Sequence, residues 1–463
     1  MIPFASIFLA LAIPTVTGFM VCLLFVRGTG FIAAICLGYG LGMGVLSYAM
    51  FLMGLLRIPY SLPLITSFLV VLAVVSGFFF YRKGRRLKEF LSPGISADER
   101  GGFLRVLLAG AIVIWLALKI VFVFHEAGLR PLYSWDSWTH WAAGAKAFFY
   151  ERGLMLDYTD DNFMAKAYRT SLGYPLHTPL IEVWIAMWVG SFHEAYVKLF
   201  SAGYFVSLLG LFFTMLRKES SWFYALLFTF FLSGVPLITY HATDANAELP
   251  VAYYAFAAVV MFWRHIKTDE LNALMLSGVF IAMAVFTKNV ALVYFVAVGI
   301  ALMVFLLVER KRFFLPAALF VVSFLVVIGP WKLFMFFNNI AYGAKEQADA
   351  AGGGFFDIKL HILGSIVREF LFTINFNLIF AFWFFMTAFF FKRMVSSEIR
   401  YINLVVVLVM GMLVYLYITP LFSHYVITRV GIHRHALTYA PIVLFISALL
   451  LKDYARGHET KKA

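Results

Sequence analysis

The sequence predicts an all-α polytopic membrane protein. Of its 463 residues, 63% are hydrophobic and 13% are charged, and the mean hydropathy is +0.89. A soluble domain usually carries about 25% charged residues. Apolar runs of about 18 residues or more recur along the chain, each long enough to cross the hydrocarbon core of a bilayer. We therefore expect about 13 transmembrane helices, a long first external loop in the core and helices at the membrane interface.

Each expected span is an apolar run bounded by polar, glycine or proline residues. The spans are residues 4–26, 31–55, 60–80, 104–125, 196–216, 221–239, 249–264, 271–287, 290–308, 314–336, 371–391, 401–418 and 436–451. The segment 176–192 is also apolar but short, and we expect an interfacial or re-entrant helix there. Trp184 and Trp188 in this segment suit an interface position.

The basic residues set the orientation. The net charge is +13, from 37 Lys and Arg against 24 Asp and Glu. Because these residues lie in short loops between spans, they act as topology signals, and we expect no nucleic-acid partner. Placing the basic clusters in the cytoplasm leaves one set of loops on the external face. These loops are 126–195, 240–248, the corner at 288, 337–370 and 419–435.

The chain divides into four predicted parts. Residues 1–80 form an accessory three-helix membrane module, and 81–103 form a basic cytoplasmic linker. Residues 104–451 form the core that carries the external loops, and 452–463 form a cytoplasmic tail. Cys22 and Cys36 lie within apolar runs, so we interpret them as core residues that form neither a disulfide nor a metal site.

Chemically useful side chains gather early in the first external loop. Asp136 lies between Trp135 and Trp138, and His140 and Lys146 follow within ten residues. A carboxylate in this position can act as a general base toward a hydroxyl group. On a helix, His140 would share a face with Asp136. The alternative is an aromatic belt at the membrane surface in which the acid is incidental.

Further candidates lie at the ends of later spans. Tyr174 and His177 open the interfacial segment, where a polar residue at headgroup level is the alternative reading. Asp244 and Glu248 are four residues apart, which would place both carboxylates on one helical face. They could equally begin the next helix, since carboxylates suit a helix N-terminus.

Two basic sites lie in predicted external loops, although Lys and Arg are usually more frequent in cytoplasmic loops. Lys288 lies at a corner between two apolar helices, where a charge costs roughly 2.5–3.5 kcal/mol to insert. Arg434 and His435 precede the last span. An anionic ligand, such as a phosphate, is a natural partner for such residues. Contact with lipid headgroups is the alternative.

Several cofactor classes lack support. The sequence has no P-loop, no H-E-x-x-H and no C-x-x-C motif. Asp136, Asp244 and Glu248 could in principle hold a divalent metal ion, but no motif supports one. No cofactor is therefore predicted with certainty.

In the region 104–451 the chain resembles the GT-C superfamily of integral-membrane glycosyltransferases, and in particular the bacterial protein O-mannosyltransferase-like and aminoarabinose-transferase-like enzymes. The matching features occur in the family's order: Trp135-Asp136 in the first external loop, Tyr174 to Pro179, Gly190 to Glu194 followed by Lys198, Glu248 to Pro250, Thr287-Lys288, Pro330-Trp331 followed by Tyr342-Gly343, and Arg434 to Pro441. Two positions depart from the family pattern. Ser137 stands where a second acid is frequent, and Lys198 stands where an arginine is usual.

This resemblance implies a lipid-phosphate-sugar-dependent glycosyltransferase of a bacterial inner membrane, with its active site facing the periplasm. The donor would be a polyprenyl-phosphate sugar, and the acceptor a hydroxyl group on a lipid, glycan or protein. Asp136 would be the base of an inverting transfer, and Lys288 and Arg434 would hold the donor phosphate. Glu248, or alternatively Asp244, would align a substrate. His140, Lys146, Tyr174, His177 and His435 would contribute to substrate binding, and membrane lipids would surround the protein.

Two rival functions stay open at this point. A transporter or flippase for lipid-linked sugars would carry charges in mid-span and broken helices. An O-antigen ligase or polymerase would also need external arginines, but its main loop usually comes late in the chain. Here the charges lie mostly at span ends and the largest loop comes early, which favours the transferase.

Overall fold

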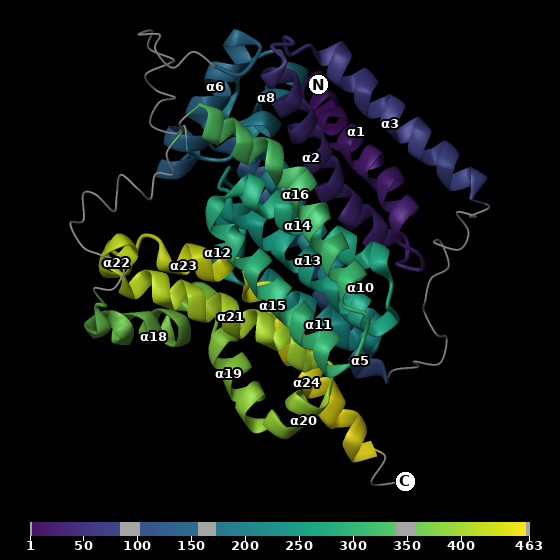
Figure 1. Ribbon diagram of the computed structural model, residues 1–463, viewed down its shortest axis with the longest axis vertical. Helices are drawn as coiled ribbons and strands as arrows, with labels where there is room; N and C mark the ends of the chain where they lie inside the picture. The colour runs from purple at the N-terminus through teal and green to yellow at the C-terminus, as the bar shows by residue number, and fades with distance from the viewer. Residues whose placement is uncertain (1, 84–101, 156–172, 339, 341–357, 460–463) are drawn as a thin grey trace. The chain divides into compact units, whose positions relative to one another are not determined.

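The computed structural model describes residues 2–83, 102–155, 173–338, 340 and 358–459, and every regular element in these ranges is helical (Figure 1). The described chain divides into two compact units. The first comprises residues 1–214, 239–253 and 286–288, and the second comprises 215–238, 254–285 and 289–463. Four helices contribute residues to both units because the unit boundaries fall within them.

The first unit holds the N-terminal helices and the long loop. Its elements are α1 (Ile2–Phe25), α2 (Phe31–Leu55), α3 (Leu62–Arg82), α5 (Phe103–Leu129), the π-helix η1 (Ser137–Trp141), α6 (Ala142–Glu151), α8 (His177–Val189), α9 (Glu194–Val197), most of α10 (Leu199–Glu219), the end of α12 (Pro236–Ala242), the start of α13 (Glu248–Thr268) and the last residues of α14 (Leu271–Thr287).

Glycines let α1 and α2 cross with their backbones in contact. A Cβ added at Gly18 would overlap the backbone of Gly38 and Gly42, and one added at Gly42 would overlap the carbonyl of Pro14. Figure 1 shows the two helices lying side by side over much of their length. Close backbone approach of this kind is typical of helix pairs in membranes.

Polar contacts tie α2 to helices from later in the chain. The hydroxyl of Tyr39 donates to the carbonyl of Phe200 at 2.7 Å, and that of Tyr253 donates to the carbonyl of Cys36 at 2.5 Å. The N-terminal helices therefore pack within the same unit as α8 and α10. The predicted accessory status of residues 1–80 stays a prediction, and most of the predicted linker 81–103 lies outside the described residues.

The second unit is built from the later helices. Its elements are α11 (Trp222–Ser233), the remainders of α10, α12, α13 and α14, η2 (Asn289–Ala291), α15 (Leu292–Val308), α16 (Phe314–Phe337), η3 (Leu360–Ile362), α18 (Leu363–Phe372), η4 (Ile374–Phe376), α19 (Ile379–Phe389), α20 (Phe391–Ser396), α21 (Ile399–Ile418), α22 (Pro420–Ile427), α23 (Ile432–Leu437) and α24 (Ala440–Glu459). In its interior Trp383 donates to Asn403 at 2.9 Å, and Tyr294 bonds to Thr438 at 2.7 Å.

The described residues include nine helices that are long and apolar enough to cross a membrane. Helices α11 and α12 together pass the same test as one bent span, with a 71° angle between its halves, which brings the number to ten. Three shorter apolar helices lie at 271–287, 379–389 and 440–452. The chain is thus an integral membrane protein, as predicted, while the count of 13 spans stays a prediction.

Two predicted continuous spans are interrupted. The span 221–239 bends between α11 and α12, where Gly234 follows the first helix and Pro236 begins the second. Pro236 has no backbone N–H and cannot continue the α11 hydrogen-bond ladder. The prediction of one continuous helix over 371–391 is wrong, because Asn377 and Leu378 have left-handed backbone conformations between η4 and α19.

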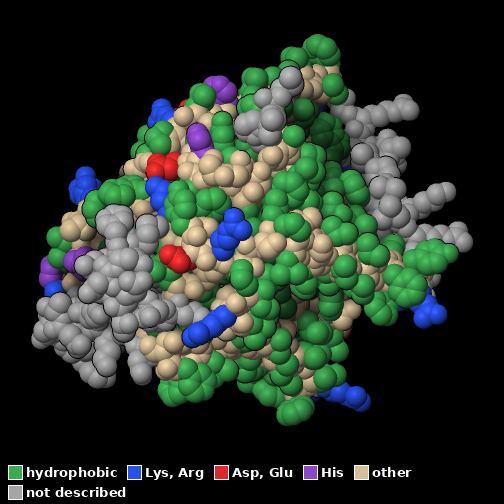
Figure 2. Space-filling model, turned by 90° about the horizontal axis from the view of Figure 1, so that it is seen from above, with side chains coloured by type: hydrophobic (Ala, Val, Ile, Leu, Met, Phe, Trp, Pro, Cys, Tyr) green, Lys and Arg blue, Asp and Glu red, His purple; other side chains and the backbone are tan. Residues whose placement is uncertain are grey.

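Several helices expose apolar side chains, as expected for surfaces that face lipid. In α5, for example, Leu118 is 62% exposed and Val121 is 65% exposed. Figure 2 shows one face of the molecule, on which hydrophobic side chains are widespread and acidic side chains are few. Such a surface is stable in a bilayer but not in water.

Candidate functional site

A short polar segment between α12 and α13 forms the centre of the candidate site. From His241 to Glu248 every residue is buried, although the segment includes a histidine, a threonine, an asparagine and two acids. Alanines alternate with the polar residues and allow close packing. Buried polar groups are costly unless they are hydrogen-bonded. The segment therefore depends on partners from elsewhere in the first unit.

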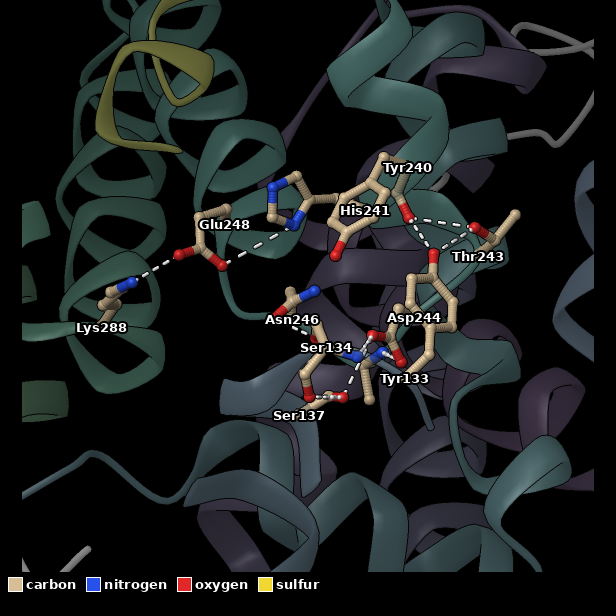
Figure 3. Close-up of polar contacts among 11 residues, drawn as sticks. Tyr133, Ser134, Ser137, Tyr240, His241, Thr243, Asp244, Asn246, Glu248 and Lys288 are labelled. Atoms are coloured by element: carbon tan, nitrogen blue, oxygen red, sulfur yellow. Dashed lines mark hydrogen bonds and ion pairs between the residues drawn. The ribbon is translucent and has the colours of Figure 1, made fainter. Parts of the chain in front are cut away.

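Asp244 binds the start of the first external loop (Figure 3). Its Oδ2 accepts a hydrogen bond from the backbone N–H of Ser134 at 2.9 Å and another from the hydroxyl of Ser137 at 3.1 Å. Its Oδ1 accepts from the backbone N–H of Ala245 at 3.0 Å. Hydrogen bonds to a carboxylate are stronger than neutral ones. Asp244 thus fixes the residues on both sides of Asp136.

Neighbouring contacts strengthen this attachment. Ser134 also donates from Oγ to Asn246 Oδ1 at 3.0 Å. The hydroxyl of Tyr133 donates to the carbonyl of Tyr240 at 3.0 Å and lies 2.8 Å from Thr243 Oγ1. Burial raises the pKa of Tyr133, so its hydroxyl stays protonated and can serve as a donor. The loop and the buried segment therefore form one hydrogen-bonded assembly.

Asp136 itself lies just before the π-helix η1. Its backbone is helical, with φ −66° and ψ −33°, and its side chain is half-buried. Single π-helical turns are rare and are frequent at functional sites. Asp136 is thus placed on a rigid support without being buried.

Glu248 is the first residue of α13 and binds Lys288. Lys288 Nζ donates to Glu248 Oε1 at 2.6 Å, and His241 Nδ1 lies 3.8 Å from Glu248 Oε2. The expectation that Asp244 and Glu248 share one helical face is wrong. Because α12 ends at Ala242 and α13 begins at Glu248, the residues between them are not helical. The two carboxylates therefore bind different partners, as Figure 3 shows.

Aromatic residues lie close to Asp136 in the chain. Trp135 and Trp138 are exposed and pack edge to face, with their ring centroids 5.0 Å apart. His140 stacks on Tyr174 with a centroid separation of 4.7 Å. These contacts join the loop to the residues that precede α8. The π-helical turn between Asp136 and His140 widens the helix, so the simple four-residue spacing does not describe their relation.

Two predicted substrate-binding residues have structural partners. Lys146 forms an ion pair with Glu194 at 2.9 Å. His177 is fully buried, with Nδ1 2.7 Å from Ser47 Oγ and Nε2 2.8 Å from the hydroxyl of Tyr204. Burial lowers the pKa of His177 to about 3, so its ring is neutral. The observed contacts of His177 are those of a residue that joins helices.

The helix α8 has 13 residues and is buried along most of its length, and Trp184 donates from Nε1 to the carbonyl of Ala10 at 2.8 Å. Trp184 thus packs within the protein, while the position of α8 at the membrane interface stays a prediction. Sequence reasoning also missed Glu182, which is fully buried in α8. Burial, together with the charge of Asp244, raises the pKa of Glu182 well above its ordinary value.

The remaining basic candidates lie in the second unit. Arg434 and His435 belong to the short helix α23, and His435 Nδ1 lies 2.5 Å from the hydroxyl of the buried Tyr417. Of the other predicted features, residues 156–172 of the first loop and Tyr342-Gly343 lie outside the described residues.

The structure shows which supporting residues the sequence did not single out. Ser134, Ser137 and His241 contact the acids that the sequence did identify, and Asn246 accepts a hydrogen bond from Ser134. The alternation of alanine with polar residues after His241 was the available signal. Within the described ranges, no three His, Cys, Asp or Glu side chains are grouped to hold a metal ion.

The fold is similar to that of one solved structure, ArnT from Cupriavidus metallidurans bound to undecaprenyl phosphate. The TM-score is 0.52 at 15% sequence identity, and the match covers 74% of this chain. The chain spans about 60% of the ArnT chain. No protein-family model matches the sequence, and no curated protein matches it either. The likeness confirms the predicted fold class, a polytopic all-α membrane protein, and shows that its fold is similar to that of ArnT.

Proposed function

We propose that the protein transfers a sugar from a polyprenyl-phosphate donor to a hydroxyl group of a lipid, glycan or protein. One observation carries this proposal: the loop that bears the half-buried Asp136 is hydrogen-bonded to a buried segment that also positions the cation of Lys288. A base and a phosphate-binding cation are the two groups that such a transfer needs. The similarity of the fold to ArnT bound to undecaprenyl phosphate supports the lipid donor.

Asp136 is the proposed general base. Its carboxylate takes the proton from the acceptor hydroxyl as the oxygen attacks the anomeric carbon. The bond from that carbon to the phosphate oxygen breaks on the opposite side, so the configuration inverts. The exposed rings of Trp135 and Trp138 flank the base and offer apolar faces to a sugar. General base catalysis of this kind contributes about 10²–10⁴-fold in rate.

Lys288 is the proposed ligand of the leaving phosphate. An ammonium group has three N–H donors, of which the bond to Glu248 uses one. The Lys288 side chain is 15% exposed, whereas the side chain of its partner Glu248 is fully buried. Negative charge grows on the phosphate as it leaves, and a fixed cation stabilises that charge. Arg434 and His435 are proposed as further phosphate ligands.

The two buried acids are proposed to position other groups. Asp244 holds the loop on either side of Asp136, and Glu248 holds Lys288. Neither carboxylate is exposed, which favours positioning over direct contact with a sugar. His140 and Tyr174 are proposed to line the acceptor side, because they stack beside the same loop. The site is proposed to face the periplasm from a bacterial inner membrane.

A test follows the donor lipid directly. The purified protein, in vesicles, is incubated with polyprenyl-phosphate sugars and with heat-treated source membranes, which supply the acceptor hydroxyl groups, and the lipids are followed by mass spectrometry. We expect loss of the sugar-bearing lipid and release of free polyprenyl phosphate, and neither with Asp136→Asn. Movement of the intact lipid between leaflets, without cleavage of the sugar–phosphate bond, would instead support a flippase and overturn the proposal.

A further inference from the structure

A cavity of about 320 Å³ lies within the second unit, at a place where the ends of several helices meet. Its charged lining consists of Glu219 at the end of α10, Lys267 near the end of α13, Glu398 directly before α21, and Lys452 in α24. Its volume is within the range of ligand cavities, which is about 300–1,000 Å³. The cavity is distinct from the candidate site, because it lies at the opposite end of α13 from Glu248.

The position of the cavity along the helices indicates the level of the lipid headgroups. Helices α10, α13 and α21 belong to segments that are long and apolar enough to cross a membrane, and the charged residues stand at their ends. Lys452 likewise ends the apolar part of α24. Charged side chains at the end of a span lie where the hydrocarbon of the bilayer gives way to headgroups and water.

Each lysine of the cavity has a carboxylate beside it. Lys267 Nζ is 2.6 Å from Glu398 Oε2, and Lys452 Nζ is 3.6 Å from Glu219 Oε2. The buried Trp263 donates from Nε1 to Glu219 Oε1 at 3.2 Å and so fixes this acid. The residues that line the cavity therefore carry two cations and two anions, and all four charged side chains are partly exposed.

This balance of charge favours one class of ligand. A purely anionic group that approaches the lysines also approaches their carboxylates, and like charges repel. A zwitterion can instead place its anionic group against a lysine and its ammonium against a glutamate, which keeps the balance. Hydrogen bonds in which donor or acceptor is charged are about twice as strong as neutral ones. The carboxylates also discriminate among zwitterions, because a primary ammonium has N–H donors and a trimethylammonium group has none.

We infer that the cavity binds the headgroup of a zwitterionic membrane lipid, in which a phosphate diester is joined to a primary ammonium, as in phosphatidylethanolamine. Trp263, Ile399 and Leu449 supply an apolar wall beside the charged groups, which suits the start of the acyl chains. The location at the ends of spans brings such a lipid to the cavity from the surrounding bilayer. This inference does not depend on the proposed transfer reaction.

The experiment uses native mass spectrometry to measure lipid binding to the full-length protein in detergent. The probe is dihexanoyl phosphatidylethanolamine. Dihexanoyl phosphatidylcholine lacks the N–H donors and dihexanoyl phosphatidylglycerol lacks the ammonium, while the acyl chains of all three are the same. We expect the ethanolamine lipid to bind about tenfold more tightly than either of the others. O-phosphoethanolamine, the free zwitterion, should bind more weakly than the lipid because it has no chains to contact the apolar wall.

Variants test whether the cavity sets this preference. Glu398→Gln leaves the cavity with a net positive charge, so the preference should shift about tenfold toward phosphatidylglycerol. Glu219→Gln removes the other acid and should act in the same direction. Asp269→Asn is the matched control, because Asp269 forms an ion pair with Lys311 but does not line the cavity. Its headgroup preference should equal that of the wild type.

Three results would overturn the inference. The first is equal affinity for the three lipids, and the second is a wild-type preference in both glutamate variants. The third is a shift of the same size in Asp269→Asn, which would mean that the preference follows the net charge of the protein. Binding of O-phosphoethanolamine as tight as that of the lipid would overturn the assignment to a membrane lipid. Melting temperatures of the lipid-free variants show which of them fold, and either glutamate variant alone is sufficient for the test.

Discussion

Lys288 and Glu248 form a hydrogen-bonded ion pair, with Nζ 2.6 Å from Oε1, in which the acid is fully buried and the lysine is not. The pair joins the corner after α14 to the first turn of α13, two places that are forty residues apart in the chain. Loss of the lysine and loss of the acid should therefore destabilise the protein by different amounts, because only the acid lacks access to water.

The first prediction compares the stability of variants that lack Lys288 with that of variants that lack Glu248. Lys288→Met should destabilise the protein by about 3–5 kcal/mol, because the buried Glu248 carboxylate loses its ion pair with the lysine. Glu248→Gln should cost less, since the freed ammonium can turn to solvent. The double variant should be more stable than Lys288→Met alone. Thermal unfolding in detergent measures all three, and equal losses in the two single variants would contradict the argument.

A second prediction concerns the base. Asp136→Asn should lower the rate of sugar transfer by about 10²–10⁴-fold, because the amide cannot accept the acceptor's proton. Its melting temperature should stay close to that of the wild type, since the side chain is only half-buried. Glu151→Gln is the matched control, because Glu151 is an exposed acid at the end of α6. Transfer at the wild-type rate by Asp136→Asn would refute the assignment.

Asp244 leads to a third prediction, in which stability and rate fall together. The Asp244 carboxylate accepts three hydrogen bonds. In an asparagine, one of the two oxygens is replaced by an N–H₂ group, which cannot accept a hydrogen bond, so at least one of these bonds is lost. A hydrogen bond to a charged group contributes about 1.5–3 kcal/mol, so Asp244→Asn should lower the melting temperature and the kcat. Ser137→Ala removes only one of the bonds and should have a smaller effect. Donor affinity should not change, and a wild-type kcat in Asp244→Asn would show that the loop needs no such support.

The fourth prediction concerns pH. The pKa of His177 is about 3 in the folded protein, and an unfolded histidine has a pKa of about 6.5. The unfolded chain therefore binds the proton more readily, and stability is lost as the pH falls below about 6.5. At pH 5 this cost amounts to about 2 kcal/mol. His177→Gln should lose less of its melting temperature between pH 7.5 and 5 than the wild type, whereas His193→Gln, at an exposed position, should behave like the wild type.

A fifth prediction tests the crossing of α1 and α2. Gly42→Ala places a Cβ against the carbonyl of Pro14, and overpacking of this kind costs about 1–3 kcal/mol. Gly110→Ala in α5 meets no atom within 4 Å and should not destabilise the protein. Thermal unfolding of the two variants compares them directly. Equal melting temperatures would show that the helices can separate without cost.

The sequence predicted the membrane class and the position of each apolar segment, because hydropathy depends mainly on composition. It did not predict where helices break inside such segments. The bend before Pro236 and the left-handed turn at Asn377 and Leu378 involve one or two residues each, and an average over a long window hides them. The sequence shows a proline at the first break and an asparagine at the second, but neither residue predicts the angle between the flanking helices.

For a similar reason, the sequence predicted some residues of the candidate site and missed others. Asp136 and Lys288 stood out because they are charged residues beside apolar runs. The roles of Ser134, Asn246 and His241 depend on contacts across more than a hundred residues, or on an unwound segment that looked helical. The four-residue spacing predicted that Asp244 and Glu248 share one helical face. In the structure, Asp244 binds the first external loop, whereas Glu248 binds Lys288.

The π-helix η1 has a consequence for how the loop can be altered. A π-helical turn contains one residue more than the α-helical turn that would otherwise join residues 135–136 to α6. A regular α-helix rotates by roughly 100° per residue, so a single deletion between Ser137 and Trp141 would turn Trp135 and Asp136 to another side of the helix. The direction in which the carboxylate points is thus set by the number of residues in this turn.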